Sequence, residues 1–229
     1  MHARYYLTLA QSAEPELYGL RQETWLDRLE EEVNNLREAL NWSLDQGEIK
    51  IGIGLAGSLW NFWTGRGLQR EGMEYVRKLL ELRPDEIGGM PLARALYAAG
   101  QLSYTLGDFM GVKEYAQESL ELYRQFGGPA DTAMAFELLS AALVTIGELQ
   151  QAEAVALEGL ALSRGANDRR AMAYTLLVCG AVPSTQGKNQ DAIVFFREGL
   201  TLAQGLGDAR LIAYELTGLG TAETNLGEY

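Results

Sequence analysis

The apolar positions of the chain recur with a step of 40 residues. Leucine keeps this step at five positions, which are Leu40, Leu80, Leu120, Leu160 and Leu200. Glycine keeps it at five others, which are Gly67, Gly107, Gly147, Gly187 and Gly227. A fixed period between about 20 and 50 residues is typical of a stacked array, in which each unit packs on its neighbours. The pattern therefore predicts a repeat protein with one continuous core.

Each unit divides into two helical halves. In the clearest unit, apolar and small residues follow one another at helical spacing from Ala93 to Gly100, and a second stripe runs from Phe109 to Leu122. Gly107 separates the two stripes and is expected to adopt a left-handed backbone conformation. No segment alternates with period two, which excludes leucine-rich and β-helical repeats. The chain is therefore predicted to be all-α and built from antiparallel helix hairpins.

A column of small residues supports the hairpin interpretation. It comprises Gly100, Ser140, Gly180 and Gly220, which lie 40 residues apart. Small side chains let two antiparallel helices approach closely, and we expect this column to serve that purpose. Pro183, late in the first helix of its unit, is expected to kink that helix.

These features resemble the tetratricopeptide repeat in a 40-residue variant. The small residue early in the unit, the Gly-Asp or Gly-Glu pair after the first helix and the small residues of the second helix carry the resemblance. It covers roughly residues 50–229. It implies a right-handed superhelical solenoid over residues 49–229, with about four full units and the first helix of a fifth.

Residues 1–48 have a different character and are interpreted as a helical linker segment that packs on the array. An apolar stripe predicts one long helix from Thr24 to about Gln46, with Thr24 as its N-cap. The run WLDRLEEEVNNLREALNWSLDQGE and the sequence after it, to about Leu80, resemble a region of bacterial STAND-class regulators of the MalT-like and AfsR-like kind. That resemblance implies an ATPase and a winged helix upstream, in a longer parent chain.

Charge and composition exclude several functions. The chain has 31 acidic and 19 basic residues and a formal net charge of −12, so it is expected to repel the phosphate backbone of nucleic acids. Its most apolar stretch, Ile51 to Trp63, is too short to span a bilayer. A single cysteine and the lack of a secretory signal favour a cytoplasmic location.

No motif predicts catalysis, a metal site or a cofactor. The chain has no Walker A sequence, and its only histidine is His2. Cys179 occupies an interior column and is interpreted as a buried, inert thiol. We therefore expect no enzymatic activity from this chain.

The candidate functional residues lie on the inner face of the first helix of each unit. The resemblance to tetratricopeptide proteins implies that this face binds a peptide, a protein or a small-molecule inducer. The matching positions are Asn61, Arg94, Tyr97, Gln101, Tyr104, Glu137, Tyr174, Ser184, Tyr214 and Thr217. Tyrosines on such a face offer large contact area and a hydrogen-bonding tip.

The leading hypothesis is a sensor or scaffold domain of a bacterial transcriptional regulator. A stand-alone tetratricopeptide scaffold or a peptide-pheromone receptor remains an alternative. An all-α toroid-type enzyme is a distant one, because Glu137 is the only acidic residue among the candidates. The fifth unit lacks its second helix, so we also expect Leu216, Leu219 and Leu226 to be uncovered and to support a homodimer.

Overall fold

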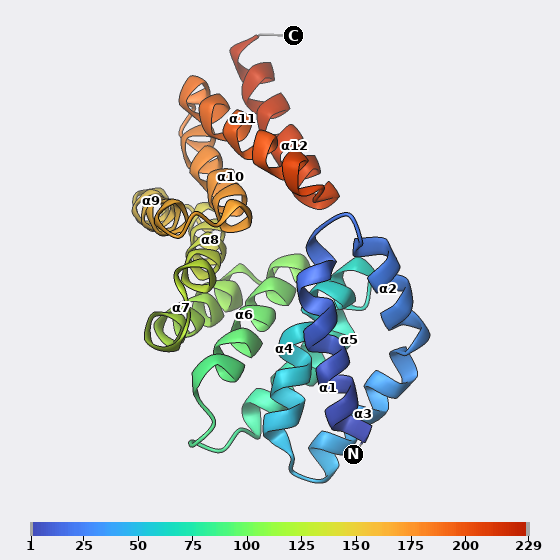
Figure 1. Cartoon of the computed structure of the whole chain (residues 1–229). Coiled ribbons are helices and arrows are strands. Elements are labelled where there is room, and N and C mark those ends of the chain that lie inside the picture. The colour runs from blue at the N-terminus through green and yellow to red at the C-terminus, as the bar shows by residue number, and fades with distance from the viewer. Residues whose placement is uncertain (1, 228–229) are drawn as a thin grey trace. The chain divides into compact units, whose positions relative to one another are not determined.

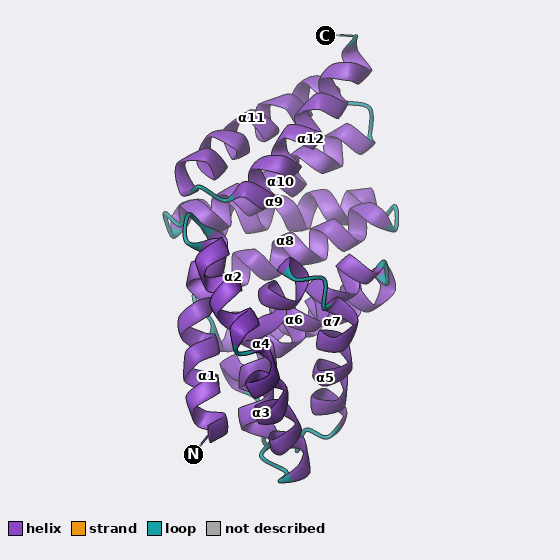
Figure 2. Cartoon of the chain, turned by 90° about the vertical axis from the view of Figure 1, so that its right-hand side faces the viewer, coloured by secondary structure: helices purple, strands orange, loops and turns teal. Residues whose placement is uncertain are grey.

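The computed structural model describes residues 2–227, which form twelve α-helices and one short 3₁₀ helix with no strand (Figure 1, Figure 2). The chain divides into two compact units, with the boundary between Phe126 and Gly127. Each unit is a separate stack of helices and is described by itself.

The first unit contains an N-terminal segment and two hairpins. Its elements are α1 (His2–Ala13), η1 (Glu14–Tyr18), α2 (Gln22–Glu31), α3 (Val33–Asp45), α4 (Ile49–Gly65), α5 (Gln69–Glu81), α6 (Gly89–Leu106) and α7 (Phe109–Phe126). Helices α4 and α5 form one hairpin, and α6 and α7 form the next. Helix α1 packs against both α4 and α3, and it runs beside α4 in Figure 1.

The second unit continues the same pattern. Its elements are α8 (Pro129–Thr145), α9 (Leu149–Gly165), α10 (Arg169–Thr185), α11 (Asn189–Leu206) and α12 (Ala209–Leu226). Helices α8 and α9 pair, α10 pairs with α11, and α12 packs on both α11 and α10. The prediction of an all-α fold made of sequential helix hairpins is confirmed.

The turn glycines behave as predicted from their 40-residue step. The backbone φ angles of all five lie between 73° and 85°, in the left-handed region that favours glycine. Asn167 (φ 52°) and Gly207 (φ 70°) occupy the corresponding position at the other end of two successive hairpins. Asparagine tolerates this conformation better than most residues.

One predicted helix is wrong in its length. The stripe from Thr24 to Gln46 forms two helices, because the chain breaks at Glu32 (φ −95°, ψ 5°), and α2 begins at Gln22 with Arg21 before it. Tyr6 on α1 donates a hydrogen bond to the Glu32 carboxylate at 2.9 Å, and Asn35 donates another at 2.6 Å. These hydrogen bonds hold the chain at the break between α2 and α3. The apolar periodicity of residues 24–46 could not predict the break, because Tyr6 lies outside that segment.

Aromatic rings pack against helix glycines, in the space that a larger side chain would occupy. A Cβ atom added at Gly180 on α10 would lie 2.6 Å from the ring of Phe196, and one added at Gly218 on α12 would lie 2.5 Å from it. The Phe196 side chain is therefore enclosed between two helices. The small-residue column serves close packing at Gly180, as expected, but Gly220 in the same column faces open space.

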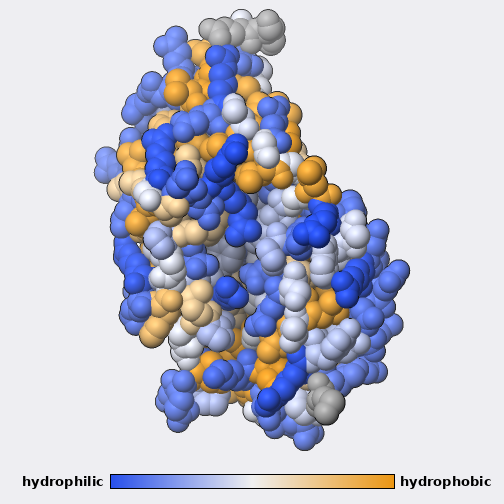
Figure 3. Space-filling view, viewed as in Figure 1, coloured by the Kyte–Doolittle hydropathy of each residue, from blue (hydrophilic) through white to orange (hydrophobic). Residues whose placement is uncertain are grey.

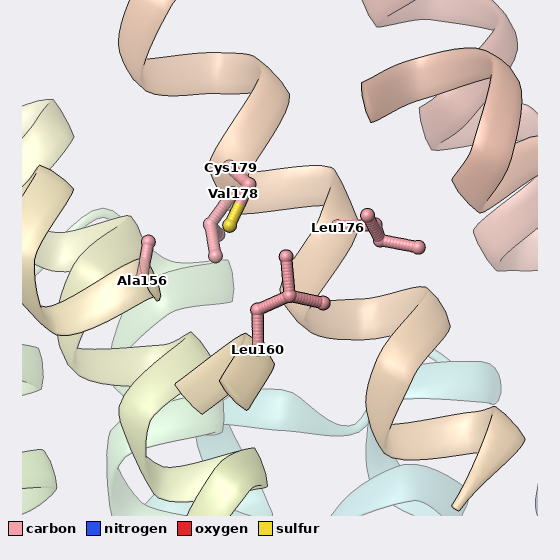
Figure 4. Packing of buried hydrophobic residues seen from close by; sticks show 5 residues of the cluster. All are labelled: Ala156, Leu160, Leu176, Val178 and Cys179. Atoms are coloured by element: carbon pink, nitrogen blue, oxygen red, sulfur yellow. The ribbon is translucent and has the colours of Figure 1, made fainter. Parts of the chain in front are cut away.

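The hydrophobic core of the second unit includes the cysteine. Cys179 is 4% exposed and packs in one cluster with Ala156, Leu160, Leu176 and Val178 (Figure 4). Burial raises the pKa of its thiol to about 12, so the thiolate is scarce at neutral pH. The prediction that the thiol is buried is confirmed, and its inertness stays a prediction that the raised pKa supports. Pro183 lies in the last turn of the same helix, which continues to Thr185.

The three leucines expected to be uncovered at the end of the array differ from one another. Leu216 is 50% exposed, whereas Leu219 and Leu226 are partly buried against a cluster that contains Ile193 and Phe196. Helix α12 therefore covers more of its apolar surface than we expected. The homodimer stays a prediction.

We predict opposite effects for the same substitution at two glycines of one column. Gly180→Ala should lower the free energy of unfolding by about 1–3 kcal/mol, because the added Cβ would lie 2.6 Å from the Phe196 ring, which Gly218 borders on its other side. Gly220→Ala should raise it by up to about 1 kcal/mol, since alanine has the higher helix propensity and meets no neighbour. Thermal unfolding followed by circular dichroism measures both, and a Gly180→Ala variant as stable as the parent would contradict the enclosed ring.

Candidate binding surface on the first helices

The ten candidate residues fall into a buried and an accessible group. Asn61, Tyr97, Glu137 and Tyr174 are buried, with exposed fractions between 3% and 8%. The accessible candidates are Arg94, Gln101, Tyr104, Ser184, Tyr214 and Thr217. The structure therefore gives the two groups different physical roles.

In the first unit, the N-terminal segment occupies part of the surface of α4. The Asn61 side chain donates a hydrogen bond to the backbone carbonyl of Leu17 at 2.8 Å, and Leu17 itself is fully buried. Beside it, the rings of Tyr18 and Trp60 lie 6.1 Å apart. The Asn61 amide thus binds a backbone carbonyl of its own chain.

Tyr97 connects three helices of the first unit. Its ring lies 5.8 Å from that of Trp60 on α4 and 6.4 Å from that of Tyr123 on α7. Its hydroxyl accepts a hydrogen bond from the Gln101 side chain at 2.7 Å. Tyr97 therefore contributes to packing, and Gln101 is the more accessible member of this pair.

In the second unit, Tyr174 holds the start of α12 against α10. Its hydroxyl donates to the Asp208 carboxylate at 2.9 Å and accepts from Arg210 at 3.2 Å. The other carboxylate oxygen of Asp208 caps α12 by accepting from the backbone N–H of Leu211 at 3.0 Å. The sequence prediction missed Asp208 and Arg210.

A signal for this cap was present in the sequence. Asp168 lies 40 residues before Asp208 and caps α10 in the same way, by accepting from the backbone N–H of Ala171 at 2.9 Å. An aspartate that recurs with the repeat period immediately before a helix is a candidate N-cap.

Two buried carboxyl groups distinguish the second unit. Burial raises the pKa of Glu137 on α8 to about 8, although the positive charge of Arg210 opposes this shift. Burial also raises the pKa of Glu215 on α12 to about 8. Both oxygens of Glu215 and one oxygen of Glu137 make no hydrogen bond to the residues that the structure describes. Both groups are therefore protonated in a large fraction of molecules at neutral pH.

The accessible candidates are mainly aromatic and hydroxyl-bearing. Tyr104 on α6 is 39% exposed, and its ring packs edge-on to Phe109 at 5.7 Å. Tyr214 on α12 is 49% exposed, and Thr217 is exposed one turn further along the same helix. In each unit, side chains of this kind offer stacking and hydrogen bonding to a ligand. Within residues 2–227, no cluster of His, Cys, Asp and Glu side chains suits a metal ion.

Comparisons with known sequences relate part of the chain to transcriptional regulators. No family model matches it. Over 135 residues, or 56% of its length, the chain is 33% identical to proteins described as HTH-type transcriptional regulators of Mycobacterium tuberculosis and Mycobacterium bovis. The aligned part of the chain spans 15% of the length of these proteins. The chain is thus a distant relative of these regulators over part of its length.

Comparisons with solved structures confirm a tetratricopeptide-like fold. A Rap protein complexed with competence and sporulation factor matches with a TM-score of 0.70 and 12% identity, over 100% of this chain and 71% of that protein. The tetratricopeptide protein YrrB matches with a TM-score of 0.55 and 15% identity, over 92% of this chain and 97% of its own. No helix in the described part of the chain has the length and apolar character of a membrane span.

The two buried carboxyls predict that stability falls as the pH rises. Each has a folded-state pKa of about 8, above the ordinary value of 4.5, so its contribution is complete below pH 4.5 and is lost as the pH approaches 8. We expect the melting temperature to drop between pH 5 and pH 8, by on the order of 10 °C. The variant Glu137→Gln/Glu215→Gln should show a much flatter dependence.

A matched variant separates this effect from the general repulsion of an acidic chain. Glu153→Gln/Asp191→Asn removes two exposed charges from the same unit and should keep the slope of the parent. Equal slopes for the parent and for the Glu137/Glu215 variant would show that the buried carboxyls do not titrate in this range.

Proposed function

We propose that the chain is a sensor or scaffold segment of a bacterial transcriptional regulator, and that it binds a peptide or a protein segment on its first helices. The observation that carries the proposal is the 33% identity to HTH-type transcriptional regulators over 135 residues. The tetratricopeptide-like fold supports a binding role, since stacked helix hairpins present extended surfaces for partners.

The net charge of this chain and the length of its relatives indicate which tasks other parts of the parent chain perform in this proposal. The relatives are much longer than the matched segment, so in this proposal other parts of a longer parent chain contact DNA and bind nucleotide. With a net charge of −12, the segment is poorly suited to a phosphate backbone. Residues 1–48 would link it to the upstream ATPase and winged helix. The segment itself would sense a partner without catalysis.

Two structural neighbours support a peptide or protein as the ligand. One was crystallised with competence and sporulation factor, and the other is described as having an unusual peptide-binding site. In the first unit, Tyr104 would provide contact area and Gln101 a polar contact. In the second unit, Tyr214 would provide contact area, and Ser184 and Thr217 would supply polar contacts. The same observations also suit a stand-alone peptide receptor. The genomic reading frame distinguishes the two, because only a regulator would encode a DNA-binding domain alongside this segment.

We predict that the exposed tyrosines contribute to peptide binding. Random-sequence peptides displayed on phage can be selected on the purified chain, and their affinities measured by calorimetry. Tyr104→Ala and Tyr214→Ala should each weaken the binding of some of the selected peptides at least about fivefold, as expected for tyrosines that anchor an interface. The melting temperature should change little, because both side chains are largely exposed.

Tyr5→Ala is the matched control. Tyr5 is 59% exposed and lies on α1, which is not one of the first helices of the hairpins. Its substitution should leave the affinity unchanged. Selected peptides that bind both tyrosine variants as tightly as the parent would place the binding surface elsewhere and contradict the proposal.

A further inference from the structure

A cleft in the first unit lies between α1, α4 and α6. Its volume is about 460 Å³, which is within the range of small-molecule sites. Leu7, Ile51, Met90 and Pro91 supply its apolar lining. Gly54 on α4 also lines it, and a Cβ atom added there would lie 3.0 Å from Leu7, so this glycine leaves space between α1 and α4. None of the ten candidates from the sequence except Arg94 lines this cleft.

The charges that line the cleft have the opposite sign to the chain as a whole. Arg4 on α1, Lys50 on α4 and Arg94 on α6 line it, and none of the lining residues is acidic. Arg94 is paired with Glu14 at 3.7 Å. Arg4 and Lys50 are exposed and form no ion pair with any residue between positions 2 and 227. In a chain with a net charge of −12, two such cations beside one apolar cleft leave a local excess of positive charge.

Two residues that line the cleft contact the Glu14 carboxylate. Ser58 donates a hydrogen bond to Glu14 at 3.2 Å, and the same carboxylate contacts Arg94. Figure 3 shows hydrophilic and apolar residues side by side over α1 and α4, the elements that form two of the walls. A short ligand suits a cleft of about 460 Å³ better than an extended peptide does.

We propose that this cleft binds a small amphiphilic anion, with a short apolar body against Leu7, Ile51 and Met90 and an anionic group near Arg4 and Lys50. The apolar lining would remove the body of the ligand from water, and the two cations would select a negative head group. The anion can be a carboxylate or a phosphate ester, since both are attracted by the same pair of cations. The cleft shares Arg94 with the candidate residues but includes none of the five side chains proposed to contact a peptide, and its existence does not depend on that function.

Calorimetric titration of the full chain with octanoate tests the proposal. Octanoate below its micelle concentration should bind, and octylamine, which has the same apolar body and a positive head, should bind at least about tenfold more weakly. Octyl phosphate should bind in the same way as octanoate. Raising the ionic strength should weaken octanoate binding, because Arg4 and Lys50 are exposed and therefore screened by salt.

A charge-matched pair of variants locates the site. Arg4→Gln/Lys50→Gln should weaken octanoate binding roughly tenfold, since each exposed charge contact contributes modestly to the affinity. Arg70→Gln/Lys78→Gln removes the same charge from exposed positions on α5, which does not line the cleft, and should leave the affinity unchanged. Circular dichroism verifies that both variants are folded.

Three results would overturn the proposal. Octanoate that fails to bind would show that the cleft is no site for this class of ligand. Equal affinity for octanoate and octylamine would show an apolar site without charge selection. An equal loss of octanoate affinity in the Arg4/Lys50 variant and in the Arg70/Lys78 variant would show a general effect of net charge. A failure of peptide binding would leave these outcomes unaffected, so the two proposals are tested independently.

Discussion

Close approach of helix backbones at glycine positions is the constraint on which this structure depends. The Phe196 ring on α11 lies against Gly180 on α10 and Gly218 on α12, so one side chain sets the separation of three helices. Similar contacts recur elsewhere, where Trp63 packs on Gly72 and Phe136 packs on Gly159. Burying a ring of this size contributes about 1.5–3 kcal/mol, and any larger residue at the glycine would push the helices apart.

The repeat period predicted the features that depend on local or neighbouring residues. The turn glycines adopt positive φ because the hairpin requires it at the same place in every unit. The break at Glu32 could not be predicted in this way, because it is held by Tyr6 from another helix. The burial of Asn61 depends on Leu17, which is 44 residues earlier in a segment outside the repeats. A period identifies equivalent positions among the units, but it contains no information about an irregular segment that covers one of them.

The repeat period also fails to predict which of the candidate residues are exposed. Tyr97, Glu137 and Thr217 occupy one column of the repeat, yet the first two are buried and the third is exposed. Tyr174 and Tyr214 occupy another, with exposed fractions of 6% and 49%. Analogy to a repeat family therefore identifies the face of a helix on which a residue lies. The exposure of that residue depends on what packs against it, and for Tyr174 this is Asp208 and Arg210 at the start of α12.

The two units differ in how their charges are arranged, so ionic strength and pH affect different groups of charges. In the first unit, the distinctive charges of Arg4 and Lys50 are exposed, so salt weakens their field. In the second unit, Glu137 and Glu215 are buried, so salt reaches them poorly, whereas a change of pH between 5 and 8 alters their protonation. Ionic strength therefore acts on the two cations of the cleft, whereas pH acts on the two buried carboxyls. A ligand effect that follows ionic strength but is independent of Glu137 and Glu215 belongs to the cleft of the first unit.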